Sequence, residues 1–309
     1  MSFKGRDVIS IADFTKEDLL EVLRTAELAE RGELPTFTKR TVMAVLFFEP
    51  STRTRLSFEA AMLRLGGSVL GFSDTSVTSL KKGESFVDTV RMVEKYADVI
   101  VMRHPLEGSA RVAAEAAAPP VINGGDGANQ HPTQTFLDLF AIKKTHPSFA
   151  TDGAEPLTMG FLGDLKYGRT VHSLSLALSF FPCRQFFVAP PTLGMPRYVR
   201  EMLDERGVSY REAERIEEVI EELDILYVTR LQQERFPDPI EFERVRGAYV
   251  VHPGILQNVK PTMRILHPLP RVGEITTEVD ATPHAYYFQQ AALGVPVRQA
   301  VLALVLGLV

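Results

Sequence analysis

The chain has 309 residues, of which 45% are hydrophobic and 24% are charged, and its mean hydropathy is +0.00. This is the composition of an ordinary soluble globular protein. A single hydrophobic core rarely grows beyond roughly 250–300 residues, so two domains are expected. The net charge of −5 and the pI near 5.9 exclude the strongly basic field that would hold nucleic acid or an anionic membrane, and neither partner is expected.

Cysteine content and the chain ends indicate the compartment. The one cysteine, Cys183, cannot form an internal disulfide or a thiolate cluster, which suits a reducing cytoplasm. Met1 to Asp13 lacks the cationic region and apolar run of a secretory signal. The apolar run Ala300 to Val309 is shorter than the roughly 20 residues needed to cross a bilayer. We expect a cytoplasmic protein whose last apolar segment is a helix packed into the core.

Short apolar runs alternate with segments of helical period along most of the chain. This pattern is typical of βα units that build a mainly parallel sheet, so it predicts an α/β fold. The predicted strands are Val42 to Phe48, Ser68 to Phe72, Val99 to Met102, Val121 to Asn123, Leu157 to Leu162, Gln185 to Ala189, Ile225 to Val228 and Arg264 to Leu266. The predicted helices are Ser57 to Leu65, Thr133 to Lys144, Arg169 to Ser179 and Pro196 to Glu205.

One stretch in the middle of the chain lacks any such period. Thr145 to Pro156 contains two prolines, one glycine and no regular apolar spacing, so it is the candidate hinge between two halves. Each half is expected to carry its own sheet.

Polar segments follow several of the predicted strands. Ligands of open α/β sheets bind beyond the carboxyl ends of the strands, so these segments are where a site is expected. They are Pro50 to Arg55, Arg103 to Pro105, Gly124 to Gln134, Thr229 to Gln232 and His267 to Pro270. If the sheets are parallel, these groups converge on one edge.

The segment Ser51 to Arg55 lies where a strand gives way to a helix predicted to begin near Ser57. Backbone N–H groups at a helix start bind phosphate oxygens, and the nearby hydroxyls and Arg53 add donors. The simpler alternative is that Ser51 or Thr52 caps the helix while the arginines pair with carboxylates. Two arginines and three hydroxyls within five residues favour the phosphate interpretation.

Other candidate residues are weaker signals when taken singly. A lone strand-end arginine such as Arg103 is more often an ion-pair partner, and a lone histidine such as His131 is more often structural. Gln134 lies one helical turn beyond His131, and the pair could bind a group with a carbonyl and an amide. The polar stretch from Ser73 to Ser85 is expected to be a loop, in which Lys81 and Lys82 could be an ordinary surface cluster.

Several familiar motifs are missing. The seven histidines have no spacing typical of zinc or iron sites, so no metal is expected. There is no phosphate-binding loop for nucleoside triphosphates, and Gly160 to Asp164 is not a dinucleotide fingerprint, which counts against a nicotinamide dehydrogenase. No nucleophile-elbow motif occurs. No cofactor is expected.

Taken together, these segments resemble the aspartate and ornithine carbamoyltransferase superfamily. Its carbamoyl-phosphate signature is similar to Ser51-Thr52-Arg53-Thr54-Arg55 followed by Ser57-Phe58-Glu59. The similarity continues in order through Met102 to Pro105, His131 to Gln134, Gly168 to Thr170, Thr229 to Gln232, His267 to Arg271 and Pro283 to Gln290. The resemblance implies two domains, each a mainly parallel sheet flanked by helices, with the last helix, about Gln290 to Val309, returning to the first domain. It implies a carbamoyl-phosphate-binding domain at residues 1–134 with 290–309, and an aspartate-binding domain at 135–289.

The implied activity is transfer of the carbamoyl group of carbamoyl phosphate to an amine, with no covalent enzyme intermediate. Three features favour L-aspartate, which would place the reaction early in de novo pyrimidine biosynthesis. Pro268 stands where ornithine enzymes have cysteine, Ser79 to Glu84 resembles the mobile loop of aspartate enzymes in a form one residue shorter, and Arg230 with Gln232 matches their acceptor-binding pair. The alternatives are a transferase for another amine such as ornithine, or a non-catalytic scaffold.

The resemblance also assigns roles to residues. Thr54, Arg103 and His131 would be catalytic. Carbamoyl phosphate would be bound by Ser51, Thr52, Arg53, Thr54, Arg103, His131, Gln134, Pro268 and Leu269. Aspartate would be bound by Arg169, Arg230, Gln232, Lys82 and Leu269. Ser79 and Lys82 would come from a neighbouring subunit of a homotrimer, and regulatory chains or a dihydroorotase are possible further partners.

Overall fold

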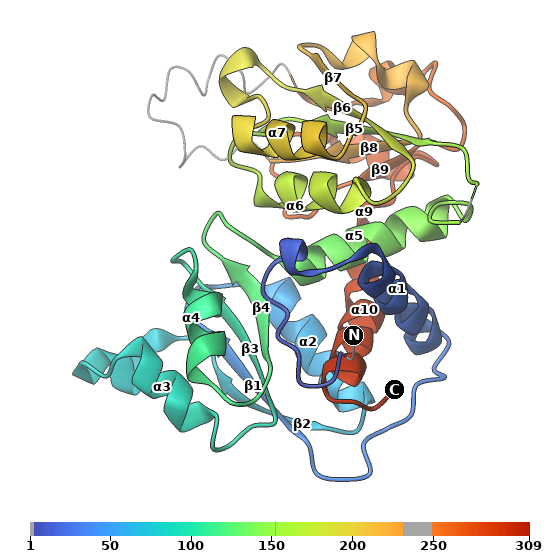
Figure 1. Cartoon of the computed structure of the whole chain (residues 1–309). Coiled ribbons are helices and arrows are strands. Elements are labelled where there is room, and N and C mark those ends of the chain that lie inside the picture. Colours follow the sequence, from blue (N-terminus) through green and yellow to red (C-terminus); the bar gives the residue numbers. More distant parts are fainter. Residues whose placement is uncertain (1–2, 152, 231–248) are drawn as a thin grey trace. The chain divides into compact units, whose positions relative to one another are not determined.

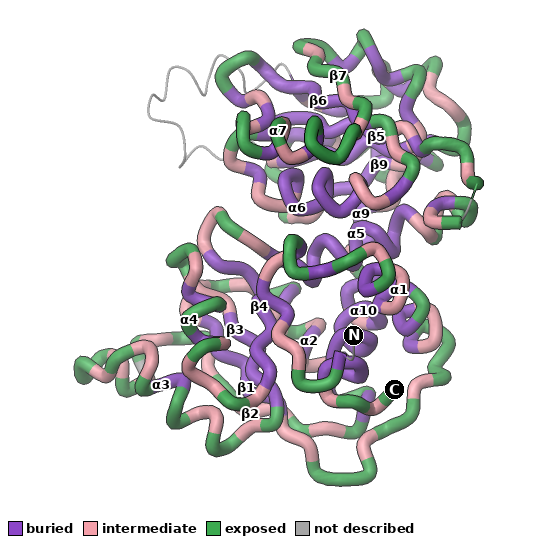
Figure 2. The backbone as a smooth tube through the Cα atoms, viewed as in Figure 1, coloured by how far each residue is buried: buried purple, intermediate pink, exposed green. Residues whose placement is uncertain are grey.

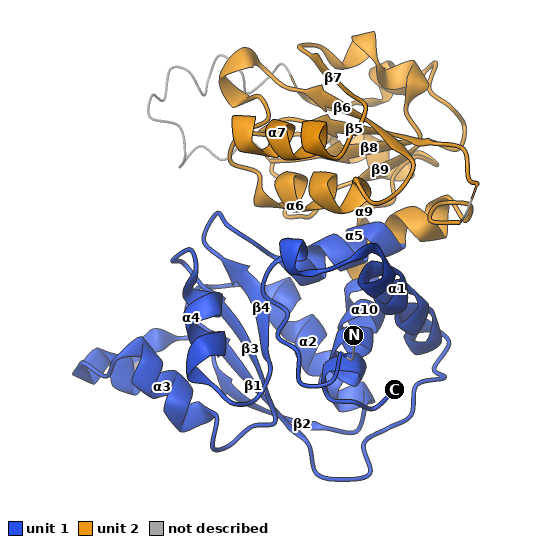
Figure 3. Ribbon diagram, viewed as in Figure 1, with its two compact units in different colours: residues 1–140, 293–309 blue, residues 141–292 orange. Residues whose placement is uncertain are grey.

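The structure, a computed structural model, describes residues 3–151, 153–230 and 249–309 (Figure 1). It divides into two compact units, Met1–Phe140 with Leu293–Val309, and Ala141–Ala292 (Figure 3). Each unit has its own parallel sheet, with strand order β2-β1-β3-β4 in the first and β7-β6-β5-β8-β9 in the second. The predicted α/β class with two sheets is confirmed. Among the described residues, no helix is both long enough and apolar enough to cross a lipid bilayer.

The sheet of unit 1 is built from nearly continuous apolar runs, as expected for parallel strands covered on both faces. Its strands are β1 (Val42–Phe47), β2 (Ser68–Phe72), β3 (Val99–His104) and β4 (Val121–Asp126). Every strand pair in this sheet is parallel, and the central strand β1 sets Met43 beside Val69 on one side and Val99 on the other. The carboxyl ends of β1, β3 and β4 therefore lie at one edge.

Helices cover the sheet of unit 1. On one face, Ala44 and Leu46 pack against Val90 of α3 (Phe86–Val93) and Ala113 of α4 (Ser109–Ala116). Helix α10 (Gly294–Val305) packs against α1 (Lys16–Glu30) and α2 (Thr52–Arg64), and almost all of its residues are buried (Figure 2). The last helix thus returns to the first unit, as predicted.

Unit 2 repeats the layered plan with shorter strands. They are β5 (Leu157–Leu162), β6 (Cys183–Val188), β7 (Tyr210–Ala213), β8 (Ile225–Val228) and β9 (Arg264–Leu266), all paired in parallel. Its helices include α6 (Arg169–Leu178), α7 (Arg197–Glu205) and α9 (Tyr287–Ala292). Helix α5 (Pro132–Thr145) spans the division between the units, and the predicted hinge follows it before β5.

Strand β7 is one element that sequence periodicity did not predict. Its four residues, Tyr-Arg-Glu-Ala, are half-buried or exposed because it lies at the edge of the sheet and pairs only with β6. An edge strand needs little apolar surface, so its sequence lacks the apolar run that marks a central strand.

Removing the ring of Phe161 should destabilise unit 2. Phe161 is fully buried on the central strand β5, and its ring lies 5.8 Å from the rings of both Phe187 and Tyr227, centroid to centroid. We expect Phe161→Ala to lower the free energy of unfolding by about 3–5 kcal/mol, measured by urea denaturation. The control is Val272→Ala, whose side chain is largely exposed. An equal effect of both substitutions would contradict this account of the core.

Candidate functional site

The turn between β1 and α2 carries the candidate phosphate-binding residues. Helix α2 begins at Thr52 rather than near Ser57, so the predicted start was wrong, and Thr52, Arg53 and Thr54 form the first helical turn. Ser51 is the N-cap residue in extended conformation, but its side chain makes no capping hydrogen bond. The simple capping alternative therefore does not explain Ser51, and the first-turn N–H groups are available to an anion.

Thr54 and His131, which are far apart in sequence, come together in unit 1. Both are buried, and Thr54 Oγ1 lies 3.5 Å from His131 Nε2. On the other side of the ring, Thr133 Oγ1 lies 3.5 Å from His131 Nδ1. These distances are at the long limit for hydrogen bonds, so both contacts are weak.

Arg53 and Arg103 form the cationic part of this region. Burial and the nearby charge of Arg103 lower the pKa of Arg53, and burial also lowers the pKa of Arg103, against the opposing effect of Glu49. Arg103 Nε lies 2.7 Å from Glu49 Oε1, but its N–H is not aligned for a hydrogen bond to that oxygen. Arg103 Nη1 donates to the Gly124 carbonyl at 3.2 Å. The charge of Arg103 thus acts on Arg53, and one carboxylate lies beside Arg103, an arrangement that favours an anion.

Gln134 lies one turn after His131 and is also buried. Its Nε2 donates to Asp138 Oδ1 at 2.9 Å. This bond fixes which end of the amide is the donor, so Oε1 of Gln134 is the atom that could accept an N–H from a ligand.

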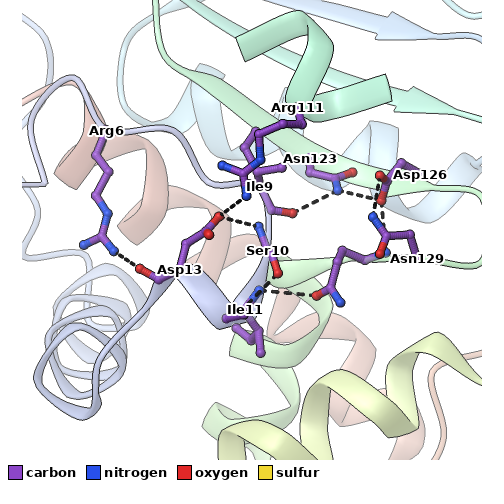
Figure 4. Close-up of polar contacts among 11 residues, drawn as sticks. Arg6, Ile9, Ser10, Ile11, Asp13, Arg111, Asn123, Asp126 and Asn129 are labelled. Atoms are coloured by element: carbon purple, nitrogen blue, oxygen red, sulfur yellow. Dashed lines mark hydrogen bonds and ion pairs between the residues drawn. The ribbon is translucent and has the colours of Figure 1, made fainter. Parts of the chain in front are cut away.

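A carboxylate that sequence analysis did not single out holds the loop before His131. Asp126 ends β4 and is almost fully buried. It accepts four hydrogen bonds, of 2.8–3.0 Å, from Asn123 Nδ2, Asn129 Nδ2 and the backbone N–H groups of Gly108 and Gln130 (Figure 4). These bonds tie β4 to the loops on either side of it. The signal in the sequence was an acidic residue within Gly124 to Gly127, but its partners are not visible without the fold.

The same network reaches the N-terminal segment of the chain. Asn123 Nδ2 also donates to the Ile9 carbonyl at 3.0 Å, and Gln130 Oε1 accepts from the Ile11 N–H at 3.3 Å (Figure 4). Gln130 directly precedes His131. The position of the histidine is therefore fixed from two sides, by β4 and by the segment at residues 9–11.

In unit 2 the candidate residues follow neighbouring strands. Arg169 begins α6 after β5, Arg230 follows β8, and Pro268 and Leu269 follow β9. Because β5, β8 and β9 are adjacent and parallel, these residues lie at the same edge of the sheet. Gln232 lies outside the described residues.

A close approach of two chain segments shapes this edge. Gly163, just after β5, has φ of +116°, and a Cβ there would lie 2.7 Å from the carbonyl oxygen of Thr229. Only glycine permits this contact, which brings the segment leading to Arg169 against the one leading to Arg230.

Ser79 and Lys82 lie on a short 3₁₀ helix, η3 (Ser79–Lys82), and both are exposed. Within the described ranges, neither side chain makes a hydrogen bond or ion pair with Thr54, Arg103 or His131. No group of three histidine, cysteine, aspartate or glutamate side chains that could hold a metal ion occurs in the described part of the chain.

Comparison with known proteins identifies the family. Residues 6–144 match the model of the aspartate/ornithine carbamoyltransferase carbamoyl-P binding domain, and residues 155–305 match that of the Asp/Orn binding domain. The aspartate carbamoyltransferase catalytic subunit of Thermococcus kodakarensis is 57% identical to this chain, over 99% of both chains. The catalytic subunit of Chromobacterium violaceum is 54% identical to it, over 98% of both chains.

Solved structures agree with the sequence comparison. The catalytic subunit of M. jannaschii aspartate transcarbamoylase is 44% identical over 96% of both chains, with a TM-score of 0.87. The Trypanosoma cruzi enzyme in complex with N-(phosphonacetyl)-L-aspartic acid is 38% identical over 98% of this chain and 97% of that one, with a TM-score of 0.91. The chain described here belongs to the aspartate/ornithine carbamoyltransferase family.

Proposed function

We propose that this chain transfers the carbamoyl group of carbamoyl phosphate to the amino group of L-aspartate, giving N-carbamoyl-L-aspartate and phosphate. The observation that carries this proposal is the gathering of Arg53, Arg103, Thr54 and His131 at the carboxyl ends of β1, β3 and β4. Relatives named aspartate carbamoyltransferase catalytic subunits support it, as does the Trypanosoma cruzi enzyme solved with carbamoyl phosphate and aspartate.

Residues of unit 1 would hold carbamoyl phosphate. The first turn of α2 would donate backbone N–H and hydroxyl hydrogen bonds to the phosphate, and two guanidinium groups would pair with its charge. The residues that would bind the phosphate are Ser51, Thr52, Arg53, Thr54 and Arg103. Thr54, Arg103 and His131 would also donate to the carbamoyl oxygen. Negative charge grows on this oxygen in the transition state, where each such donor commonly supplies roughly 2.7–4 kcal/mol. Gln134 Oε1 and the carbonyls of Pro268 and Leu269 would accept the amide N–H bonds.

Residues of unit 2 would select the acceptor. Aspartate has two carboxylates, and the planar forks of Arg169 and Arg230 suit carboxylates better than the point charge of lysine does. Gln232, Lys82 and the Leu269 carbonyl would complete the contacts. The amine nitrogen bonds to the carbamoyl carbon, the bond from that carbon to the phosphate oxygen breaks, and the departing phosphate takes the amine proton. Catalysis is then positioning and charge stabilisation.

The proposal extends to the assembly. Residues 1–134 with 290–309 would form the carbamoyl-phosphate-binding domain, and residues 135–289 the aspartate-binding domain, of a cytoplasmic enzyme of pyrimidine biosynthesis. Ser79 and Lys82 are exposed in unit 1, so they are free to enter the site of a neighbouring chain. We infer a homotrimer with shared sites, to which regulatory chains or a dihydroorotase could bind.

Acceptor choice is tested with two amines and one variant. The wild-type protein should form carbamoylated product with aspartate and not with ornithine in a colorimetric assay. Calorimetry with an analogue that joins a phosphonate to two carboxylates should show tight binding to wild type. Binding to Arg230→Ala should be weaker by roughly 10-fold or more, because a charge-assisted hydrogen bond worth about 1.5–3 kcal/mol is lost. The control is Arg197→Ala, a largely exposed arginine on α7. Equal affinity of Arg230→Ala and wild type would contradict the acceptor assignment.

Shared sites are tested by mixing inactive chains. Arg53→Ala and Lys82→Ala should each be nearly inactive alone, but co-expression should restore activity, since about a quarter of the sites in random trimers would combine two intact halves. The matched control is a mixture of Arg53→Ala with Arg103→Ala, whose lesions fall in the same half and should not complement. Equal recovery in both mixtures, or none in the first, would argue against a shared site.

A further inference from the structure

Leu269 has an unusual backbone conformation for a residue with a side chain. Its φ is +57°, in the left-handed region, and it lies in the loop directly after β9. A residue with a Cβ pays roughly 1–2 kcal/mol in this region, so the conformation persists only where surrounding contacts impose it.

One contact that holds Leu269 is a hydrogen bond from its backbone to a buried histidine. The Leu269 N–H donates to His267 Nδ1 at 2.7 Å, and His267 is 1% exposed. Because Nδ1 accepts this bond, it carries no proton, and the proton of the neutral ring lies on Nε2. Nε2 is 2.7 Å from Glu274 Oε1, so it donates to that carboxylate.

The histidine is itself held on both sides. The His267 N–H donates to Oε1 of Gln290, a fully buried residue of α9, at 2.8 Å. Glu274 Oε2 accepts a hydrogen bond from the Val272 N–H at 2.9 Å, so the carboxylate links His267 to the backbone at Val272. Burial is the largest single effect on Glu274 and opposes its ionisation, but the hydrogen bond and electrostatic effect of His267 and the bonds from the backbone N–H groups of Val272 and Glu274 together outweigh it, so the pKa of the carboxyl is lowered. Glu274 therefore stays ionised and fixes the ring proton on Nε2.

We propose that His267 is a positioning residue that aims the Pro268 and Leu269 carbonyls and so makes the site prefer a carbamoyl group over an acyl group without an amide. The inference rests on the proposed function, in which these carbonyls accept the amide N–H bonds. A methyl group in place of the amide offers no donor. The carbonyls can discriminate against it only if the loop cannot turn them elsewhere.

Two substitutions distinguish the roles of the two ring nitrogen atoms of His267. His267→Asn places a side-chain oxygen near the position of Nδ1, so the acceptor for Leu269 N–H is kept. His267→Gln places an amide near Nε2, so a donor to Glu274 is kept and the acceptor is lost. The probes are phosphonoacetamide, a stable analogue with the carbamoyl amide, and phosphonoacetone, which has a methyl group in its place.

Calorimetry on the intact protein measures the ratio of the two dissociation constants. Wild type and His267→Asn should bind phosphonoacetamide more tightly than phosphonoacetone. In His267→Gln this ratio should fall on the order of 10-fold, because binding of phosphonoacetamide weakens while the affinity for phosphonoacetone is unchanged. A wild-type ratio in His267→Gln, or an equal loss in both variants, would overturn the inference. No preference in wild type would also overturn it, by removing the proposed role of the carbonyls. Failure of both probes to bind wild type would instead overturn the proposed function.

A second measurement does not depend on folding of the variants. ¹⁵N-histidine NMR of the wild-type protein should show His267 as the neutral tautomer with its proton on Nε2, before and after phosphonoacetamide is added. A proton on Nδ1 in either state would break the bond to Leu269 and overturn the inference.

Discussion

The electrostatic effect of Arg103 on Arg53 is the constraint on which the proposed chemistry of unit 1 depends. Burial disfavours both cations, the charge of Arg103 further disfavours Arg53, and Glu49 offsets only part of the cost for Arg103. A protein tolerates such a cluster where a ligand supplies the missing negative charge. In the proposed function, the phosphate and the developing oxyanion of carbamoyl transfer are both of this kind, so binding and catalysis would draw on the same pair of charges.

Electrostatic stabilisation of this kind requires that the donors are fixed before the substrate arrives. Asp126 meets this requirement in unit 1, because one carboxylate gathers N–H groups from the segments around β4 and leaves the loop before His131 little freedom. His267 has the comparable place in unit 2. Both are buried polar groups that hold the backbone of a loop, so each would act on the substrate through that loop rather than by contact.

Much of the fold and many site residues could be predicted from the sequence. Buried parallel strands have continuous apolar runs, and the residues that follow them meet at one edge whatever lies between them in the sequence. The strand ends predicted that the segments of Thr54 and His131 lie at one edge, and the structure shows the two side chains in contact.

Other features could not be predicted, each for a physical reason. The true start of α2 was obscured because Thr52 to Thr54 are polar, so the apolar period begins a turn later than the helix. Edge strand β7 has no apolar run. The partners of Asp126 and the left-handed backbone of Leu269 depend on contacts between segments that no local pattern records. The assigned contacts of Arg230 and Lys82 with substrate remain predictions.

The return of α10 to unit 1 has a consequence for the order in which the chain folds during synthesis. Unit 2 is one uninterrupted stretch, residues 141–292, whereas the core of unit 1 includes a helix that is made only after the whole of unit 2. While the ribosome is still at work, the faces of α1 and α2 that α10 later covers stay open to water. Unit 2 is therefore the first that can close its core, and unit 1 must avoid aggregation until α10 emerges.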